Sequence, residues 1–189
     1  MSPLLKKPFL DPDELRNYRP VSNLTFASKV IERIVASRLT RYLESHMPRM
    51  QSGYRKYHST ETALLRVMSD VYAAADERRV TLLALLDLSA AFHCVDHDIL
   101  LRRLRLAFGI KGSALAWLSS FLSARTQPVY YLGQLSEVCH FLFGVAQGSA
   151  LGPLLFLLCV AEVAEVLAAH GFKGYSYADD TKMYISVSK

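Results

Sequence analysis

The sequence predicts a mixed α/β (α+β) fold in which helices cover one side of an antiparallel sheet. Three observations predict it. The first part of the chain has helical periodicity, because its apolar residues recur every three to four positions. Short β-prone runs follow at Val80–Leu86, Lys173–Tyr177 and Met183–Val187. The last two runs flank a tight acidic turn, a pattern typical of a hairpin, and the strands of a hairpin are antiparallel.

Length and composition limit the size of the fold. The chain has 189 residues, of which 51% are hydrophobic. This is enough for one sizeable core and too little for two full domains. The formal net charge of +5 favours polyanionic partners such as nucleic acid, although many proteins without such partners are equally basic.

The cysteines and the N-terminus predict an intracellular protein, in the nucleus or the cytoplasm. Cys94, Cys139 and Cys159 form no CxxC pair and are typical of free thiols in a reducing compartment. The first ten residues lack the apolar run of a signal peptide.

Two long helices are expected, one near each end of the chain. The first covers Phe26–His46 and is expected to bury one apolar face. That face comprises Phe26, Val30, Ile31, Ile34, Val35, Leu39, Tyr42 and Leu43. The second covers Ala150–Ala169 and has the length of a membrane span. Glu162 and Glu165 favour a buried core helix instead, so no membrane partner is expected.

Three acidic residues stand where strands are expected to end. Asp87 follows a continuous apolar run, expected to be a strand buried on both faces, and Asp179 and Asp180 form the hairpin turn. A carboxylate at the end of an apolar strand is costly unless it is paired or binds a cation. Converging carboxylates would suit magnesium and phosphoryl transfer. On residue types alone, a helix cap for Asp87 and an ordinary turn for Asp179 and Asp180 explain these acids somewhat better than a metal site does.

Two loops add weaker signals. Gly144–Pro153 has three glycines before a long helix, which allows close approach of a ligand and favours anions, but also fits a plain helix start. Gln51–Lys56 combines basic and aromatic residues suited to phosphate contact and base stacking, or to a solvated loop.

Taken together and in order, these motifs resemble the reverse transcriptase domain of non-LTR (LINE-type) retrotransposons, near the jockey-like and chicken-repeat-like branch. The motifs that carry the resemblance are Asn17–Ser22, Gln51–Lys56 with His58–Leu64, Leu86–Phe92, Gly144–Pro153 and the Tyr-Ala-Asp-Asp box at Tyr177–Asp180.

The resemblance implies a right-hand polymerase fold, with fingers and palm present and the thumb absent. Residues 1–189 would form a single partial domain, fingers-like to about residue 79, with the palm and some fingers elements from about residue 80. The implied function is RNA-directed DNA polymerase, an enzyme that transfers deoxynucleotides to a primer 3′-hydroxyl with two Mg²⁺ ions. The implied partners are an RNA template, a DNA primer and deoxynucleoside triphosphates, with no protein partner.

The resemblance also assigns roles residue by residue. Asp87, Asp179 and Asp180 match the family's catalytic, metal-binding carboxylates. Phe92 matches the bulky residue that blocks a ribose 2′-hydroxyl, with a core phenylalanine as the alternative. Arg55 matches a contact to the triphosphate, with a surface arginine as the alternative. Further nucleotide-binding positions are Ala90, Ala91, Gln147 and Gly148, and nucleic-acid-binding positions are Lys56 and Tyr177.

The chain also departs from the family pattern. His93 replaces an Asp, Ala146 replaces a Pro, and Cys159–Val163 replaces a Tyr-Ile-Asn-Asp-like run. These changes, with the expected lack of a thumb, leave a second interpretation open: a catalytically inactive remnant that binds nucleic acid weakly.

Overall fold

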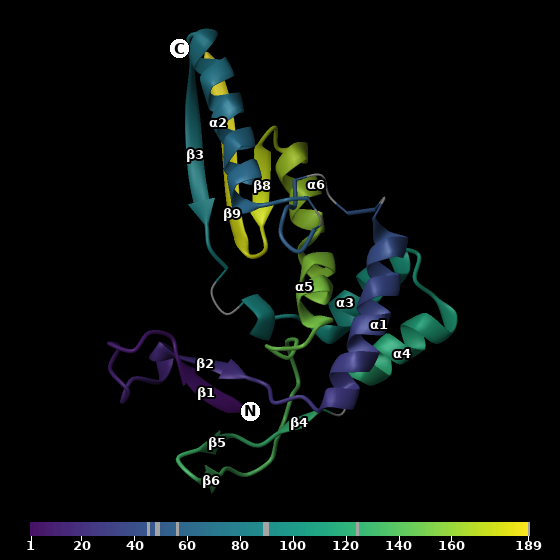
Figure 1. Cartoon of the computed structure of the whole chain (residues 1–189). Coiled ribbons are helices and arrows are strands. Elements are labelled where there is room, and N and C mark those ends of the chain that lie inside the picture. Colours follow the sequence, from purple (N-terminus) through teal and green to yellow (C-terminus); the bar gives the residue numbers. More distant parts are fainter. Residues whose placement is uncertain (45, 48–49, 56, 89–90, 124, 189) are drawn as a thin grey trace. The chain divides into compact units, whose positions relative to one another are not determined.

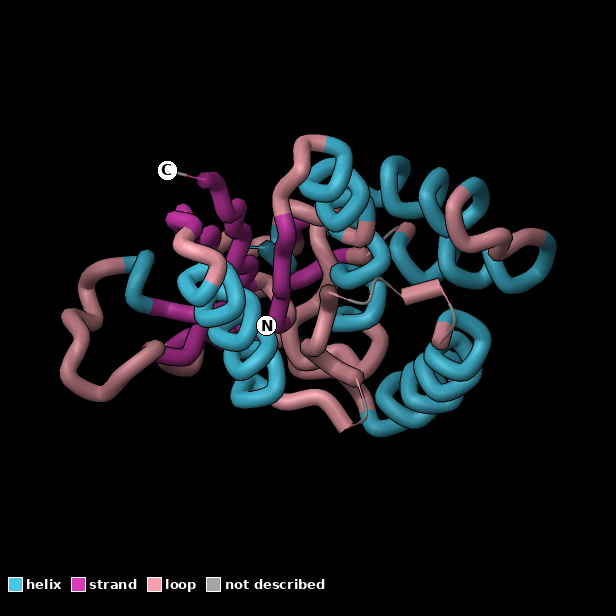
Figure 2. The backbone as a smooth tube through the Cα atoms, turned by 90° about the horizontal axis from the view of Figure 1, so that it is seen from above, coloured by secondary structure: helices cyan, strands magenta, loops and turns pink. Residues whose placement is uncertain are grey.

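The fold, taken from a computed structural model, comprises two compact units that interleave along the chain. Residues 1–44, 46–47, 50–55, 57–88, 91–123 and 125–188 are described. The first unit combines Met1–Tyr42 with Phe92–Phe156, and the second combines Leu43–Ala91 with Leu157–Lys189. The predicted class is confirmed, because the described residues combine helices with antiparallel strands (Figures 1 and 2). The expected fingers–palm division near residue 80 stays a prediction.

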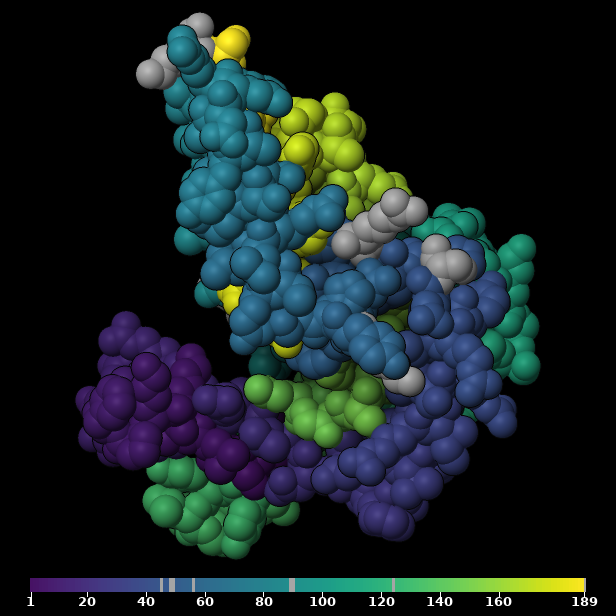
Figure 3. Space-filling model, turned by 45° about the horizontal axis from the view of Figure 1, so that its top comes forward, coloured from purple at the N-terminus to yellow at the C-terminus, as the bar shows by residue number. Residues whose placement is uncertain are grey.

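A three-stranded antiparallel sheet forms the centre of the second unit. Its order is β3 (Arg79–Leu86), β9 (Asp180–Ser188) and β8 (Lys173–Tyr177). The predicted hairpin is confirmed, although β9 starts earlier than expected, at Asp180. Helix α2 (Thr60–Asp76) contacts all three strands and covers one face of the sheet (Figures 1 and 3).

Local sequence explains where α2 begins and how it is held. Ser59 and Thr62 form a reciprocal capping box at its N-terminus, which satisfies backbone N–H groups that would otherwise lack partners. Further along α2, Asp70 accepts hydrogen bonds from the Tyr184 hydroxyl at 2.7 Å and from Lys173 Nζ at 3.1 Å. These bonds join the helix to β9 and β8.

Strand β3 corrects one expectation, because it is not buried on both faces. It lies at the edge of the sheet and pairs only with β9 among the described strands. Leu82 is 67% exposed and Leu85 is 69% exposed, and these two side chains point to opposite faces. A continuous apolar run cannot distinguish an edge strand from a central one, which is why the prediction was wrong.

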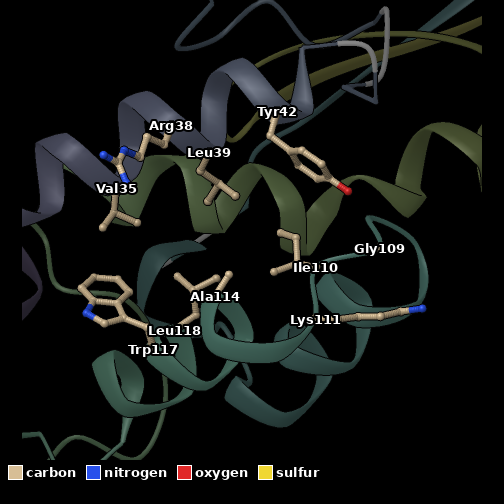
Figure 4. A pocket seen from close by; sticks show the side chains of 10 residues that line it. All are labelled: Val35, Arg38, Leu39, Tyr42, Gly109, Ile110, Lys111, Ala114, Trp117 and Leu118. Atoms are coloured by element: carbon tan, nitrogen blue, oxygen red, sulfur yellow. The ribbon is translucent and has the colours of Figure 1, made fainter.

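Three helices dominate the first unit: α1 (Phe26–Leu43), α3 (His97–Leu106) and α4 (Gly112–Leu122). Helices α3 and α4 pack together. A cavity of about 440 Å³ lies between α1 and α4, where Val35 and Leu39 face Trp117 and Leu118 (Figure 4).

The buried face of α1 differs from the predicted one. Leu39 and Leu43 are buried as expected, but Phe26 is 83% exposed and Ile34 is also exposed. Glu32 is buried instead, with 1% exposure. Positions 32, 39 and 43 share one side of a helix, so the helix turns a carboxylate inward in place of part of its apolar stripe.

Small strand pairs complete the first unit. Strands β1 (Ser2–Leu5) and β2 (Tyr18–Val21) are antiparallel and flank a short 3-10 helix at Leu15–Asn17. The segment that follows α4 forms two short antiparallel pairs. They are β4 (Thr126–Gln127) with β7 (Cys139–His140), and β5 (Tyr130–Tyr131) with β6 (Gln134–Leu135). A second 3-10 helix covers Ala91–His93.

The apolar helix expected over Ala150–Ala169 is divided into α5 (Gly152–Val160) and α6 (Glu162–Ala169). Residues Leu154–Leu158 of α5 are each at most 8% exposed. Gly152–Ala169 is long and apolar enough to cross a membrane by length and composition alone. The burial of α5 within the fold is typical of a core helix.

Candidate active site

The register of the sheet brings the three predicted carboxylates to one end of it. The last pair between β3 and β9 is Leu86 with Thr181. Asp87 follows Leu86, and Asp180 precedes Thr181, so extending the register by one residue sets these two acids opposite each other. Residues directly opposite in an antiparallel pair project from the same face. Asp179 lies in the turn that connects β8 to β9.

The turn that carries Asp179 has an unusual backbone. Tyr177 pairs with Asp180, so Ala178 and Asp179 are the two connecting residues. Ala178 has a φ of 56°, in the left-handed region that residues with a Cβ rarely adopt, and its side chain is buried. Such a conformation persists only where neighbouring contacts determine it.

Gln51 supplies those contacts. It is 5% exposed, and its side-chain amide bonds both backbone groups of Ala178. Ala178 N donates to Gln51 Oε1 at 3.0 Å, and Gln51 Nε2 donates to Ala178 O at 3.2 Å. Gly53 N donates to the same Oε1 at 2.8 Å. One buried side chain therefore fixes the turn next to the catalytic candidates.

Gly53 is required where this segment meets the turn. A Cβ on Gly53 would lie 2.3 Å from Ala178 N, closer than any real contact. Backbone bonds from Ser52 N to Ser176 O and from Ser176 N to Met50 O, both 2.8 Å, extend the attachment along β8. The Gln-Ser-Gly part of the motif is thus a brace for the acidic hairpin.

Two neighbours of Gly53 lie next to this brace. Burial, and then the charge of Asp179, raise the pKa of the Tyr54 phenol above its ordinary value. Arg55 is half-buried and donates from Nη1 to Gln51 O at 3.2 Å. Its predicted contact with a triphosphate stays a prediction. Lys56 lies outside the described residues.

Phe92 and the glycine-rich loop come together in the first unit. Val145 N donates to Phe92 O at 2.7 Å. Gly144 has a φ of 86°, and a Cβ there would lie 2.7 Å from Phe92 O, so only glycine fits. The half-buried Phe92 ring packs against Phe156 with centroids 5.0 Å apart. This packing fits both the sugar-blocking role and the core alternative.

The predicted loop residues Gln147 and Gly148 follow directly. Ser22 N donates to Gln147 O at 2.8 Å, which ties the loop to the end of the Asn17–Ser22 motif. Gln147 is half-buried and Gly148 is exposed. Ala146, which stands where the family has Pro, is buried, and its carbonyl accepts from Ser149 N at 3.0 Å.

The remaining predicted positions are less informative. Ala91 is buried in the second unit, and its N–H donates to Leu88 O at 3.2 Å. Tyr177 is half-buried at the end of β8. Ala90 lies outside the described residues.

The chemistry of the donors fits a hard divalent cation, because all three candidates are carboxylates at one sheet end. Across the part of the chain that the structure describes, no three Asp, Glu, His or Cys side chains are gathered closely enough to hold a metal ion. The expected close approach of the Asp87 and Asp179 side chains therefore stays a prediction.

Sequence reasoning gave no individual role to Gln51 or Glu32, whereas Tyr54 is the aromatic residue of the loop expected to suit base stacking. Gln51 was noticed only as part of a motif, and Glu32 was not noticed at all. A polar residue inside an apolar helical stretch was the available signal for Glu32.

Residues 5–189 match the protein family described as "Reverse transcriptase (RNA-dependent DNA polymerase)". The chain belongs to the reverse transcriptase family. As predicted, it is a reverse transcriptase domain of the non-LTR, LINE-type retrotransposon kind. Reverse transcriptases of this family generally use divalent metal ions.

Named relatives agree with this assignment. The domain is 33% identical over 157 residues to the "Probable RNA-directed DNA polymerase from transposon X-element" of Drosophila melanogaster, covering 82% of this chain and 17% of that protein. It is 33% identical over 183 residues to the "RNA-directed DNA polymerase from mobile element jockey" of the same species, covering 90% and 19%. The domain thus spans less than a fifth of these relatives.

A solved structure shows the same fold. The apo telomerase of Candida tropicalis, truncated from its C-terminal domain, matches with a TM-score of 0.55 at 14% identity. The match covers 84% of this reverse transcriptase domain and 33% of the telomerase chain. At this level of identity the likeness concerns the fold alone.

Proposed function

We propose that this domain carries the nucleotidyl-transfer site of an RNA-directed DNA polymerase, with Asp87, Asp179 and Asp180 as its catalytic carboxylates. The observation that carries the proposal is the register of β3 with β9, which sets Asp87 and the acidic turn at the same end of one sheet. The reaction is attack of a primer 3′-hydroxyl on the α-phosphate of a deoxynucleoside triphosphate.

The three carboxylates would hold two Mg²⁺ ions. When bound, such ions supply Lewis acidity and neutralise charge in phosphoryl transfer. Oxygen donors on a rigid sheet end are suited to magnesium, which prefers carboxylates and substrate phosphates. Gln51 contributes by keeping the backbone of Ala178, and hence the adjacent acids, in one conformation.

Phe92, Gln147 and Gly148 would form the wall beside the incoming nucleotide. The bond from Val145 N to Phe92 O supports this role, since it joins the loop to the residue expected to exclude a ribose 2′-hydroxyl. Arg55 would contact the triphosphate and Ala91 the nucleotide. Ala90 and Lys56 keep their expected roles on sequence grounds.

The partners would be an RNA template, a DNA primer and deoxynucleoside triphosphates. The distribution of charge supports a polyanionic partner: the first unit has 13 Lys and Arg against 7 Asp and Glu, a net charge of +6. Such an excess attracts phosphates and raises the rate of encounter. Tyr177 would contact the nucleic acid beside the acidic turn.

The carboxylate assignment is tested by metal binding. Free Mn²⁺ is titrated against the purified chain and followed by electron paramagnetic resonance, with Asp179→Asn/Asp180→Asn as the test variant. Asp76→Asn, a change of an exposed acid at the end of α2, is the matched control. We expect binding in the wild type and control and its loss in the double variant. Equal binding in all three would overturn the assignment.

A further inference from the structure

Glu32 is a buried carboxylate for which the proposed reaction has no use. It lies in α1, where the neighbouring Lys29 and Arg33 are exposed, and is itself 1% exposed. Burying an ionised carboxylate is costly unless hydrogen bonds compensate. The partners of Glu32 therefore indicate what its burial achieves.

Those partners all come from one short segment and from its own helix. Glu32 Oε2 accepts from Ser149 Oγ at 2.5 Å and from Ala150 N at 2.9 Å, with Leu151 N at 3.5 Å. Ser28 Oγ donates to Oε1 at 3.2 Å. Hydrogen bonds to an ionised acceptor are stronger than those to a neutral one, so this carboxylate holds Ser149 and Ala150 in place.

Ser149 extends this hydrogen-bond network to the start of α5. Its Oγ accepts from Leu151 N at 3.1 Å and from Gly152 N at 3.0 Å. A negative charge near a helix N-terminus is also favoured by the helix dipole. The carboxylate and the hydroxyl together satisfy the N–H groups of Ala150, Leu151 and Gly152.

The anchored segment directly follows Gln147 and Gly148. On their other side, Ser22 N donates to Gln147 O at 2.8 Å, so the N-terminal part of the chain holds the loop at both ends. Ser22 contributes its backbone N–H, which only substitution by proline would remove. Glu32 contributes a side chain whose charge can be removed without changing its shape.

We propose that Glu32 is a positioning residue that holds the Gln147–Gly152 loop in the conformation used for nucleotide binding. The assignment of the loop to the nucleotide rests on the proposed function, whereas the anchoring of the loop by Glu32 does not. Neutralising the carboxylate leaves an amide with one uncharged acceptor oxygen in place of two charged ones, so the bonds to Ser149 and Ala150 weaken and the loop loosens while the helices remain.

The experiment is amide hydrogen exchange on the full chain, comparing wild type, Glu32→Gln and the matched control Glu137→Gln, which changes an exposed acid of the same unit. We expect exchange over residues 147–152 to accelerate about tenfold or more in Glu32→Gln, since a hydrogen bond to a charged group contributes at least that much. In Glu32→Gln, exchange in α3 should stay unchanged. In Glu137→Gln, exchange should stay unchanged in every segment. Unchanged loop exchange, or equal acceleration across the whole chain, would overturn the proposal.

A second readout separates this inference from the proposed function. Binding of dATP with Mg²⁺ is measured by calorimetry on the same proteins, with Ser149→Ala as a partial disruption. We expect weaker binding in Glu32→Gln, with Ser149→Ala intermediate. If wild type and Glu32→Gln bind equally while the loop is loosened, the positioning role is overturned. A wild type that binds no dATP contradicts the nucleotide role of the loop, and exchange then decides the anchoring alone.

Discussion

The side chain of Gln51 bonds both backbone groups of Ala178, although the two residues are 127 positions apart. Ala178 has a positive φ and is followed by the two acids of the hairpin. The amide thus compensates a strained backbone at the point where carboxylates have to be held in place. The relationship assigns to the Gln-Ser-Gly motif a structural task in the acidic hairpin, separate from any contact with nucleotide.

Gln51→Glu should destabilise the second unit. The variant keeps the shape of the side chain but loses the Nε2 donor to Ala178 O and adds a negative charge beside an acidic turn. We expect the free energy of unfolding to fall by about 1–3 kcal/mol. Urea denaturation followed by circular dichroism measures this, with the exposed Gln134→Glu as control. Equal stability of the two variants would contradict the brace.

Gly53→Ala tests the close approach of the same two segments. An added Cβ would meet the backbone of Ala178 at 2.3 Å, and backbone cannot move aside as a flexible side chain can. Gly171→Ala is the comparison, because Gly171 has a φ of 76° but open space around it. That variant should lose about 1 kcal/mol through backbone strain. Gly53→Ala should lose more in the same denaturation assay, and a smaller loss would refute the steric argument.

The link between Asp70 and Tyr184 predicts a pH dependence. The hydrogen bond from Tyr184, together with Lys173, holds the pKa of the Asp70 carboxyl below its ordinary range. A depressed folded-state pKa contributes stability that is present above the unfolded pKa of about 4 and is lost as pH falls through the folded value. Asp70→Asn should cost about 1–3 kcal/mol at neutral pH and flatten the decline below about pH 4.

The measurement for Asp70 is urea denaturation of wild type and variant between neutral pH and acid. Asp76→Asn is the control on the same helix, because that carboxylate is exposed. An Asp70→Asn profile that runs parallel to the wild type at all pH values would show that the carboxylate is not linked to folding in this way.

The sequence was sufficient where local signals determine structure. The β8–β9 hairpin was predicted because two β-prone runs flank a short turn. That Asp87 belongs with the acidic turn was predicted only from the order of the motifs in the reverse transcriptase family. Its register with β9 depends on pairing between strands far apart in the sequence, such as Leu86 with Thr181, which no local pattern encodes.

Where the sequence was misleading, a three-dimensional partner decides the outcome. The apolar stripe of α1 predicted a face that included Phe26 and Ile34, but Glu32 faces inward because Ser149 and Ala150 provide its donors. The exposure of β3 depends on its place at the sheet edge, not on its composition. Gln51 was missed as a brace because its partner is remote in sequence.

Phe92 is expected to discriminate between sugars. If its ring occupies the place of a ribose 2′-hydroxyl, Phe92→Val should raise the affinity for ATP about tenfold while that for dATP changes little. Calorimetry with each nucleotide and Mg²⁺ measures the ratio. Phe156→Val, which removes the ring that packs against Phe92, reports the effect of lost packing alone. If Phe92→Val changes the ratio of ATP affinity to dATP affinity only as much as Phe156→Val does, Phe92 is a core phenylalanine. In a form of the protein that extends primers, the same Phe92 variant should incorporate more ribonucleotides.

The isolated polypeptide of 189 residues should show little or no primer extension, even with Mg²⁺ and all four deoxynucleotides. It spans under a fifth of its relatives, so few phosphates of a primer–template duplex can be neutralised by this polypeptide alone. Affinity for nucleic acid falls with each phosphate contact that is missing. Poor positioning then removes a proximity contribution of about 7–11 kcal/mol to the barrier. His93 and Ala146 add to the loss if they displace the loops around the nucleotide.

Extension of a labelled primer on an RNA template is measured beside an Asp179→Asn/Asp180→Asn control. Robust extension that disappears in the control would establish this domain as a competent minimal polymerase and refute the prediction.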